Sequence, residues 1–209
     1  MDYRSARMNM VESQVRTNDV TDPQIQDAMR TVERERFCAP ARAFCAYAEV
    51  EAEICPGRLL MKPRDIAKLL QTLRPEEGER ALALAAPYAA AVMARMGLKV
   101  TAQEADARVG AVVGQALHDH GVPLEIADLR EPVGDGWDLI VSEGAVAEVP
   151  ATWTRALRPG GRLAVVLRDG PVGKARLFQR IESGASSREV FDSTPPILDG
   201  FVRTPSFQF

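Results

Sequence analysis

The first third of the chain carries hydrophobic residues three and four positions apart, which predicts amphipathic helices. Asp22-Pro23 separates two of these helices, and a proline is well tolerated in the first turn of the helix that follows. A third helix is expected over residues 63–73, and the segment 48–62, which contains Pro56-Gly57, is expected to be an ordered loop. The hydrophobic positions of the three helices are Met8, Val11 and Val15; Ile25, Met29 and Val32; and Ile66, Leu69, Leu70 and Leu73.

Beyond Arg80, short hydrophobic runs of strand length alternate with helical patterns, which is typical of βαβ units around a parallel sheet. After Gly170 the pattern predicts a further helix over residues 172–181. Two strands, over residues 187–192 and 201–207, are expected to pair as an antiparallel hairpin at the sheet edge. The other strands are expected at 81–85, 99–103, 124–126, 137–141 and 162–167, and the intervening helices at 88–96, 105–118 and 150–157.

These elements predict an α/β fold of the Rossmann type in a single domain over residues 1–209. Its core, over residues 76–209, is a mostly parallel sheet with an antiparallel C-terminal hairpin, and residues 1–75 form an N-terminal helical extension. A length of 209 residues with 46% hydrophobic residues is ordinary for one globular domain.

The composition argues against several classes of partner. The chain has 26 Lys and Arg against 29 Asp and Glu, so its net charge of -3 does not favour electrostatic binding to nucleic acid or anionic lipid. No segment approaches the roughly 20 apolar residues of a membrane span, and the polar start does not resemble a secretory signal. Cys38, Cys45 and Cys55 lack metal-site spacing and are expected to be small buried side chains in a reduced compartment. We therefore expect a cytoplasmic protein without a metal; its oligomeric state stays open.

Candidate chemistry lies where the predicted strands end, because ligands of open parallel sheets bind beyond the carboxyl ends of the strands. The first strand ends at Ala85-Ala86-Pro87, and Glu104 ends the second strand about 20 residues later, where an acid commonly binds a ribose. Asp128 follows the third strand. The alternative for Glu104 is an exposed acid at a helix start, where the helix dipole favours a negative charge.

Several segments resemble one enzyme family over nearly the whole chain. Residues 10–15 (MVESQV), 21–29 (TDPQIQDAM) and 32–37 (VERERF) resemble the opening of the protein-L-isoaspartate O-methyltransferases, and Ala46-Tyr47 and Pro56-Gly57 continue the match. Residues 137–141 (WDLIV) and 157–163 (LRPGGRL) resemble the fourth and fifth strands of that family. The last pattern is shared by many methyltransferases, so it supports the fold more than the substrate.

The resemblance implies an S-adenosylmethionine-dependent methyltransferase fold and methylation of the α-carboxylate of isoaspartyl residues in protein repair. The substrate would be a protein or peptide. A carboxylate is already ionised at neutral pH, so such an enzyme mainly aligns the reactants and excludes water. The resemblance places the cofactor beside Ala85, Ala86, Tyr88, Glu104 and Asp128.

The predicted cofactor turn departs from the family pattern. The family has an acidic residue in the strand and a glycine-rich turn that ends in Gly-Tyr, whereas this chain has Ala83 in place of the acid and a shorter turn without glycine before Tyr88. The Cβ atoms of Ala85 and Ala86 occupy space that the cofactor would need, and a left-handed conformation costs a non-glycine residue about 1–2 kcal/mol. Pro87 also removes a backbone donor. The simpler interpretation is that the turn packs the following helix onto the sheet.

The predicted substrate loop departs as well. The family has a Gly-x-Thr-Ile-Ser-x-Pro stretch, and this chain has GRLLMKP over residues 57–63. Leu59 and Met61 replace the two hydroxyl residues and cannot donate a hydrogen bond to a carboxylate, so no catalytic residue is assigned. Arg58 and Lys62 either bind an anion or are simply solvated.

Three hypotheses follow. The first is a divergent isoaspartyl methyltransferase that retains Tyr88, Glu104 and Asp128 around S-adenosylmethionine. The second is a catalytically inactive binding or regulatory protein with the same fold and no cofactor, which the joint loss of two sites favours. The third is a protein of this fold that binds a different ligand, such as an anion held by Arg58 and Lys62.

Overall fold

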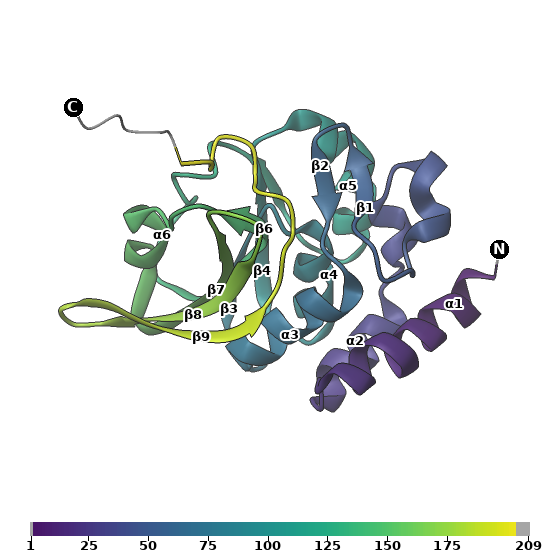
Figure 1. The fold of residues 1–209 in the computed structure, drawn as a ribbon, viewed down its shortest axis with the longest axis horizontal. Helices are drawn as coiled ribbons and strands as arrows, with labels where there is room; N and C mark the ends of the chain where they lie inside the picture. The colour runs from purple at the N-terminus through teal and green to yellow at the C-terminus, as the bar shows by residue number, and fades with distance from the viewer. Residues whose placement is uncertain (1, 204–209) are drawn as a thin grey trace.

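The computed structural model describes residues 2–203, which fold around a seven-stranded sheet with helices on both faces (Figure 1). The strand order is β5-β4-β3-β6-β7-β8-β9, and β3 to β7 run parallel while β8 and β9 are antiparallel. A mostly parallel sheet with antiparallel C-terminal strands is therefore confirmed. The strands are β3 (Arg80–Leu84), β4 (Lys99–Glu104), β5 (Leu124–Ile126), β6 (Trp137–Val146), β7 (Leu157–Arg168), β8 (Gly173–Ile181) and β9 (Gly184–Asp192).

The two faces of the sheet are covered differently. One face packs against α3 (Pro63–Leu73), α4 (Pro87–Arg95), α5 (Ala107–Asp119) and the N-terminal helices. The other face packs against α6 (Ala151–Arg155) and the segment that carries Leu198 and Phe201. Period-two alternation in β3 explains this arrangement, because Ala81 and Ala83 face the first core whereas Leu82 and Leu84 face the second.

The N-terminal extension is helical, as expected. α1 (Tyr3–Met10) continues into a π-helical turn, η1 (Val11–Val15), and a 3-10 turn, η2 (Arg16–Asn18). The helix α2 (Pro23–Thr31) begins at an Asp22 cap whose carboxylate accepts from the Gln24 amide. Two 3-10 segments follow, η3 (Arg34–Phe37) and η4 (Pro40–Cys45).

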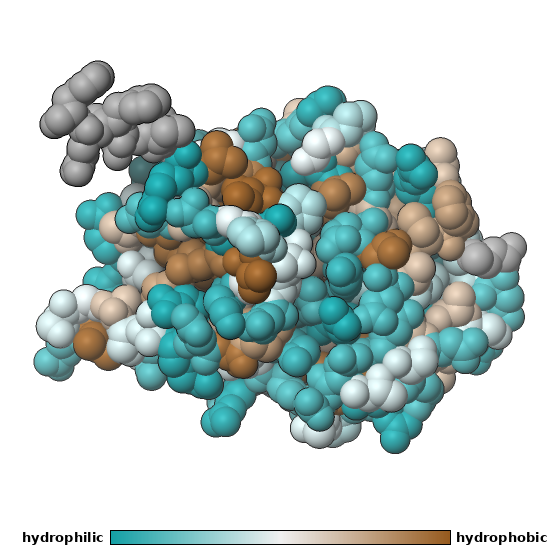
Figure 2. All heavy atoms as spheres, in the orientation of Figure 1, coloured by the Kyte–Doolittle hydropathy of each residue, from teal (hydrophilic) through white to brown (hydrophobic). Residues whose placement is uncertain are grey.

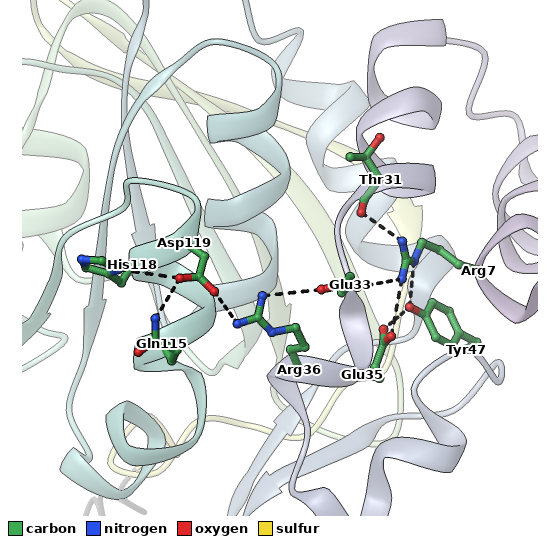
Figure 3. A network of polar contacts seen from close by, with 9 residues as sticks. All are labelled: Arg7, Thr31, Glu33, Glu35, Arg36, Tyr47, Gln115, His118 and Asp119. Carbon is green, nitrogen blue, oxygen red and sulfur yellow. Dashed lines mark hydrogen bonds and ion pairs between the residues drawn. The ribbon is translucent and has the colours of Figure 1, made fainter. Parts of the chain in front are cut away.

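Charged residues connect this extension to the sheet core (Figure 3). The Arg7 guanidinium on α1 donates to the Tyr47 hydroxyl at 2.9 Å and to the Thr31 carbonyl at 3.0 Å. Further along, Arg36 of η3 pairs with Asp119 at the end of α5 at 2.5 Å. The extension is thereby fastened to a helix of the sheet core.

The C-terminal part differs from the expectation. Residues 172–181 were expected to be helical, and this prediction is wrong: they form β8, which pairs antiparallel with β7 and β9. Ala175 and Leu177 point to the core while Lys174 and Arg176 alternate with them, and pairing along β7 and β9 outweighs any local helical preference. The hairpin is formed by β8 and β9 rather than by residues 187–192 and 201–207; residues 201–203 are not a strand, and 204–207 lie outside the described residues.

The segment 48–62, expected as an ordered loop, contains two short strands, β1 (Ala52–Cys55) and β2 (Arg58–Leu60), which pair antiparallel. Pro56 and Gly57 form their turn, and Gly57 adopts a φ of 89°. This hairpin brings Arg58 and Met61 to the carboxyl edge of the sheet, because Arg58 contacts β4 and Met61 contacts β6.

Exposed hydrophobic side chains are scattered. On the face drawn in Figure 2, small hydrophobic groups are separated by hydrophilic residues. No described helix is long and apolar enough to cross a membrane. The large hydrophobic residues that are exposed are Met8, Phe44, Val50, Ile126, Val172, Ile181 and Val202.

Candidate functional site

The turn between β3 and α4 lies at the carboxyl edge of the sheet and is completely enclosed. Ala85, Ala86 and Tyr88 are each at most 1% exposed. Ala85 adopts a left-handed φ of 50°, a conformation that favours glycine, and its amide donates to the Gln103 carbonyl at 2.8 Å. The turn is thus held by its neighbours in a strained conformation, and α4 packs directly on the sheet.

Glu104, at the end of β4, is buried rather than exposed at a helix start, so the exposed alternative is wrong. Its side chain is 1% exposed, and both carboxylate oxygens accept from Arg58: Oε1 from Nη2 at 2.7 Å and Oε2 from Nε at 3.3 Å. Burial raises the pKa of the Glu104 carboxyl, and the Arg58 guanidinium opposes that shift. The pair is a two-point contact between planar groups, the strongest geometry available to these side chains.

Arg58 also joins Glu104 to the turn. Its Nη2 donates to the Ala85 carbonyl at 2.6 Å, and Nη1 donates to the Leu59 carbonyl at 3.1 Å. The residue is only 8% exposed, so the expectation of a solvated Arg58 is wrong. Lys62 points elsewhere, with its Nζ 3.8 Å from a carboxylate oxygen of Glu51. The two cations of this loop therefore do not form one anion site.

A second buried carboxyl holds the same loop. Glu143 lies in β6, where the register with β7 shifts between Val141 and Ala145, and it is fully buried. Its Oε1 accepts from the Met61 amide at 3.0 Å, while its Oε2 has no partner. Burial raises the pKa of the Glu143 carboxyl to about 7, against the opposing charges of Arg34 and Arg58.

Arg34 of η3 completes the contacts to this loop. Its Nη2 donates to the Met61 carbonyl and its Nε to the Ala46 carbonyl at 2.8 Å, so the Met61 backbone is held from both sides. The Arg34 guanidinium lies 4.6 Å from the Tyr88 ring centroid, and the Tyr88 hydroxyl has no partner. Neither Arg34 nor Glu143 was predicted from the sequence as part of the site. A charged residue inside the hydrophobic strand β6 was the available signal for Glu143.

The residues at the former hydroxyl positions differ in exposure. Met61 is 1% exposed and Leu59 is half-buried. The cavity between residues 57–61, Gly144 and residues 195–198 measures only about 10 Å³, roughly the smallest volume that accommodates a single water. This part of the edge is closed by side chains.

Asp128 does not join this cluster. It is exposed after β5, where its carboxylate accepts from the Arg130 amide at 2.9 Å. Within residues 2–203, no hydrogen bond or ion pair connects its side chain to Arg58 or Glu104. The structure thus brings Ala85, Glu104 and Arg58 together and leaves Asp128 outside.

The described residues contain no group of three or more His, Cys, Asp or Glu side chains that could hold a metal ion. The three cysteines are unpaired; Cys38 and Cys55 are buried as expected, whereas Cys45 is partly exposed. Burial raises the pKa of the Cys38 thiol to about 11, so it is not an activated nucleophile.

Comparison with known proteins points to one family. The family model described as protein-L-isoaspartate(D-aspartate) O-methyltransferase matches residues 5–193. A protein-L-isoaspartate O-methyltransferase of Methylorubrum extorquens is 34% identical, with 95% of this chain and 91% of that protein covered. One from Methylorubrum populi is 31% identical, with 94% and 96% covered.

Solved structures share the fold. A protein-L-isoaspartate O-methyltransferase has a TM-score of 0.77 at 20% identity, with 95% of this chain and 67% of that one covered. A Plasmodium falciparum structure, described as a putative enzyme of this kind in complex with S-adenosyl-L-homocysteine, has a TM-score of 0.78 at 15% identity, with 92% and 98% covered. On the family model and the sequence identities together, the chain belongs to the protein-L-isoaspartate O-methyltransferase family.

Proposed function

We propose that this chain is a non-catalytic member of its family, a binding or regulatory protein that retains the methyltransferase fold without transferring methyl groups. The observation that carries the proposal is the guanidinium of Arg58, which engages both oxygens of Glu104 and the carbonyl of Ala85. An acid at the end of the second strand binds ribose hydroxyls in sheets of this kind. Here the acid already has an internal partner.

The surrounding residues do not fit S-adenosylmethionine. Ala85 places a Cβ atom in a turn where the family pattern has glycine, and Pro87 lacks an amide hydrogen. Leu59 and Met61 offer no side-chain donor for a substrate carboxylate. Cofactor and substrate positions are therefore both altered, which supports loss of the reaction more strongly than either change alone.

The energy of displacing Arg58 also supports the proposal. Leaving one member of a buried ion pair without its partner costs about 3–5 kcal/mol. A ligand that would otherwise bind with a dissociation constant of about 1 µM has a binding free energy of about -8 kcal/mol. Displacement would thus weaken it to roughly the millimolar range, unless the ligand supplied equivalent contacts.

The two alternatives to this proposal are an active methyltransferase and an anion-binding protein. Family membership favours a methyltransferase that acts on a protein or peptide, in which the cofactor displaces Arg58 from Glu104. The anion-binding hypothesis is disfavoured, because the Arg58 guanidinium is paired with Glu104 whereas Lys62 lies near Glu51. For any of these roles we place the protein in the cytoplasm, in keeping with its three unpaired cysteines.

The proposal is tested by adding S-adenosylmethionine or S-adenosylhomocysteine to the purified protein at 1 mM (on the order of 100 times a 10 µM dissociation constant). A ligand that bound at that ratio would stabilise the folded state by about 2.7 kcal/mol and raise the melting temperature. Because the proposal requires that neither ligand binds, we expect an unchanged melting temperature. We also expect no transfer of labelled methyl to an isoaspartyl peptide. A clear thermal shift together with labelled product would contradict the proposal.

A further inference from the structure

Glu143 and its neighbours form a buried cluster beneath the loop 58–61. The carboxyl lies on β6, and the groups that influence it electrostatically are Arg34 of η3, Cys38 after η3, Arg58 of β2, Tyr88 of α4 and Glu104 of β4. None of them pairs directly with the carboxyl. Its single hydrogen bond comes from the Met61 amide, at 3.0 Å.

The positive groups around Glu143 donate to other partners, and Nη1 of Arg34 is buried without a partner. Arg58 is paired with Glu104 at 2.7 Å, and Arg34 donates through Nε and Nη2 to the backbone carbonyls of Ala46 and Met61. The second oxygen of Glu143 has no partner. An ionised carboxylate in this position has lost its hydration without gaining an ion pair, so the closed arrangement favours the protonated form.

The same carboxyl would be solvated if the loop moved away from β6. It would then regain water on both oxygens, and its ionised form would be favoured at neutral pH. A proton is therefore bound more tightly when the loop is closed than when it is open. By linkage, raising the pH must shift the loop toward the open form until the closed form is also ionised.

We infer that Glu143 is a proton-controlled latch, which holds the loop 58–61 against β6 when the carboxyl is protonated and releases it more readily when the carboxyl is ionised. The inference concerns the closure of the loop and holds whether or not the cofactor site is functional. Burial brings the pKa of Glu143 to about 7, which places the change near neutral pH.

The latch is tested by hydrogen exchange of the Met61 amide between pH 5 and pH 8, corrected for the intrinsic exchange rate at each pH. We expect protection to fall by about 100-fold from pH 5 to pH 8, because the pKa of the carboxyl is about 7 when buried against an ordinary value of 4.5. Glu143→Gln should remove this dependence. Glu125→Gln, at an exposed position on β5, should retain it.

The result that would overturn the inference is a protection factor that is constant with pH, or one that falls equally in the wild type and in Glu143→Gln. If Glu143→Gln does not fold, the pH titration of the carboxyl carbon resonance of Glu143 is measured by NMR in the wild type. A midpoint near 7 supports the latch, and a midpoint near 4.5 contradicts it. No cofactor is present in either measurement, so failure of the latch is distinguishable from failure of the proposed function.

Discussion

The N-terminal extension and the carboxyl edge of the sheet use buried arginines in different ways. In the extension, Arg7 donates to Tyr47, Thr31 and Glu35, and these contacts hold helices together (Figure 3). At the sheet edge, Arg58 donates to the carboxylate of Glu104, a group that related folds turn toward a ligand. The first arginine connects helices of the scaffold, whereas the second bonds to a carboxylate at the end of a strand.

The two regions also differ in their relation to the family. The extension resembles the family opening at residues 10–15, 21–29 and 32–37, and the last of these segments carries Arg36, which pairs with Asp119 of α5. The cofactor turn and substrate loop depart from the family and are closed by their own side chains. The extension thus keeps the family pattern, whereas the strand-end carboxylate of Glu104 is bonded within the protein, as the proposed function requires.

The largest effect is expected for Arg58→Met, which keeps much of the side-chain volume but leaves Glu104 buried without its partner. We expect the free energy of unfolding to fall by about 3–5 kcal/mol, measured by urea denaturation. The double variant Arg58→Met with Glu104→Leu should recover most of the loss, because neither charge is then left alone. Equal losses in the single and the double variant would show that the pair is not the source of the stability.

The next effect concerns pH. The folded-state pKa of Glu143, about 7, lies above its ordinary value of 4.5. The folded protein therefore holds this proton more tightly, and the associated stability is lost as pH rises from about 4.5 to 7, by up to about 3 kcal/mol. Urea denaturation of the wild type and Glu143→Gln across this range measures the difference between their unfolding free energies. A difference that does not change with pH would contradict the assignment.

A smaller effect is expected in the extension. Arg7→Met removes a donor from the Thr31 carbonyl, the Tyr47 hydroxyl and the Glu35 carboxylate, although the last two still bond to each other, and we expect about 2 kcal/mol of destabilisation. The Met61 amide should keep its dependence of exchange on pH, because Arg7 makes no contact with the loop 58–61. A change in that dependence would show that the extension and the sheet edge are coupled.

The smallest effect is expected for Ala85→Gly, which relieves the left-handed strain at φ 50°. Relief of about 1–2 kcal/mol is largely offset by the greater flexibility of glycine in the unfolded chain, so the net change should stay within about 1 kcal/mol. The variant should still fail to bind S-adenosylhomocysteine in calorimetry, because Arg58 remains on Glu104. Binding restored by this change alone would assign the closure to the turn rather than to Arg58.

Local patterns predicted most of the sheet but little of the site. The five parallel strands and the helices of the sheet core follow from hydrophobic periodicity, which acts over a few residues. The helix predicted over residues 172–181 was wrong because pairing with β7 and β9 decided that segment.

The site depends on distant contacts. Arg58 and Glu104 are 46 residues apart, and Met61 and Glu143 are 82 residues apart. Only the fold brings them together. The sequence indicated that the predicted cofactor turn and hydroxyl positions differ from the family pattern, but it did not indicate which side chains fill that space. The position of Glu104 was predicted from its place at the end of the second strand, and the structure supplied its partner.

In the proposed function, Arg58 occupies the position on Glu104 that a nucleoside would otherwise take. This is tested by a crystal structure of the wild-type protein grown with S-adenosylhomocysteine at millimolar concentration. We expect the Arg58 guanidinium to remain on Glu104 and Ala85, with no nucleoside at the carboxyl edge of β3 and β4. A ribose bound to Glu104, with Arg58 turned away, would contradict it.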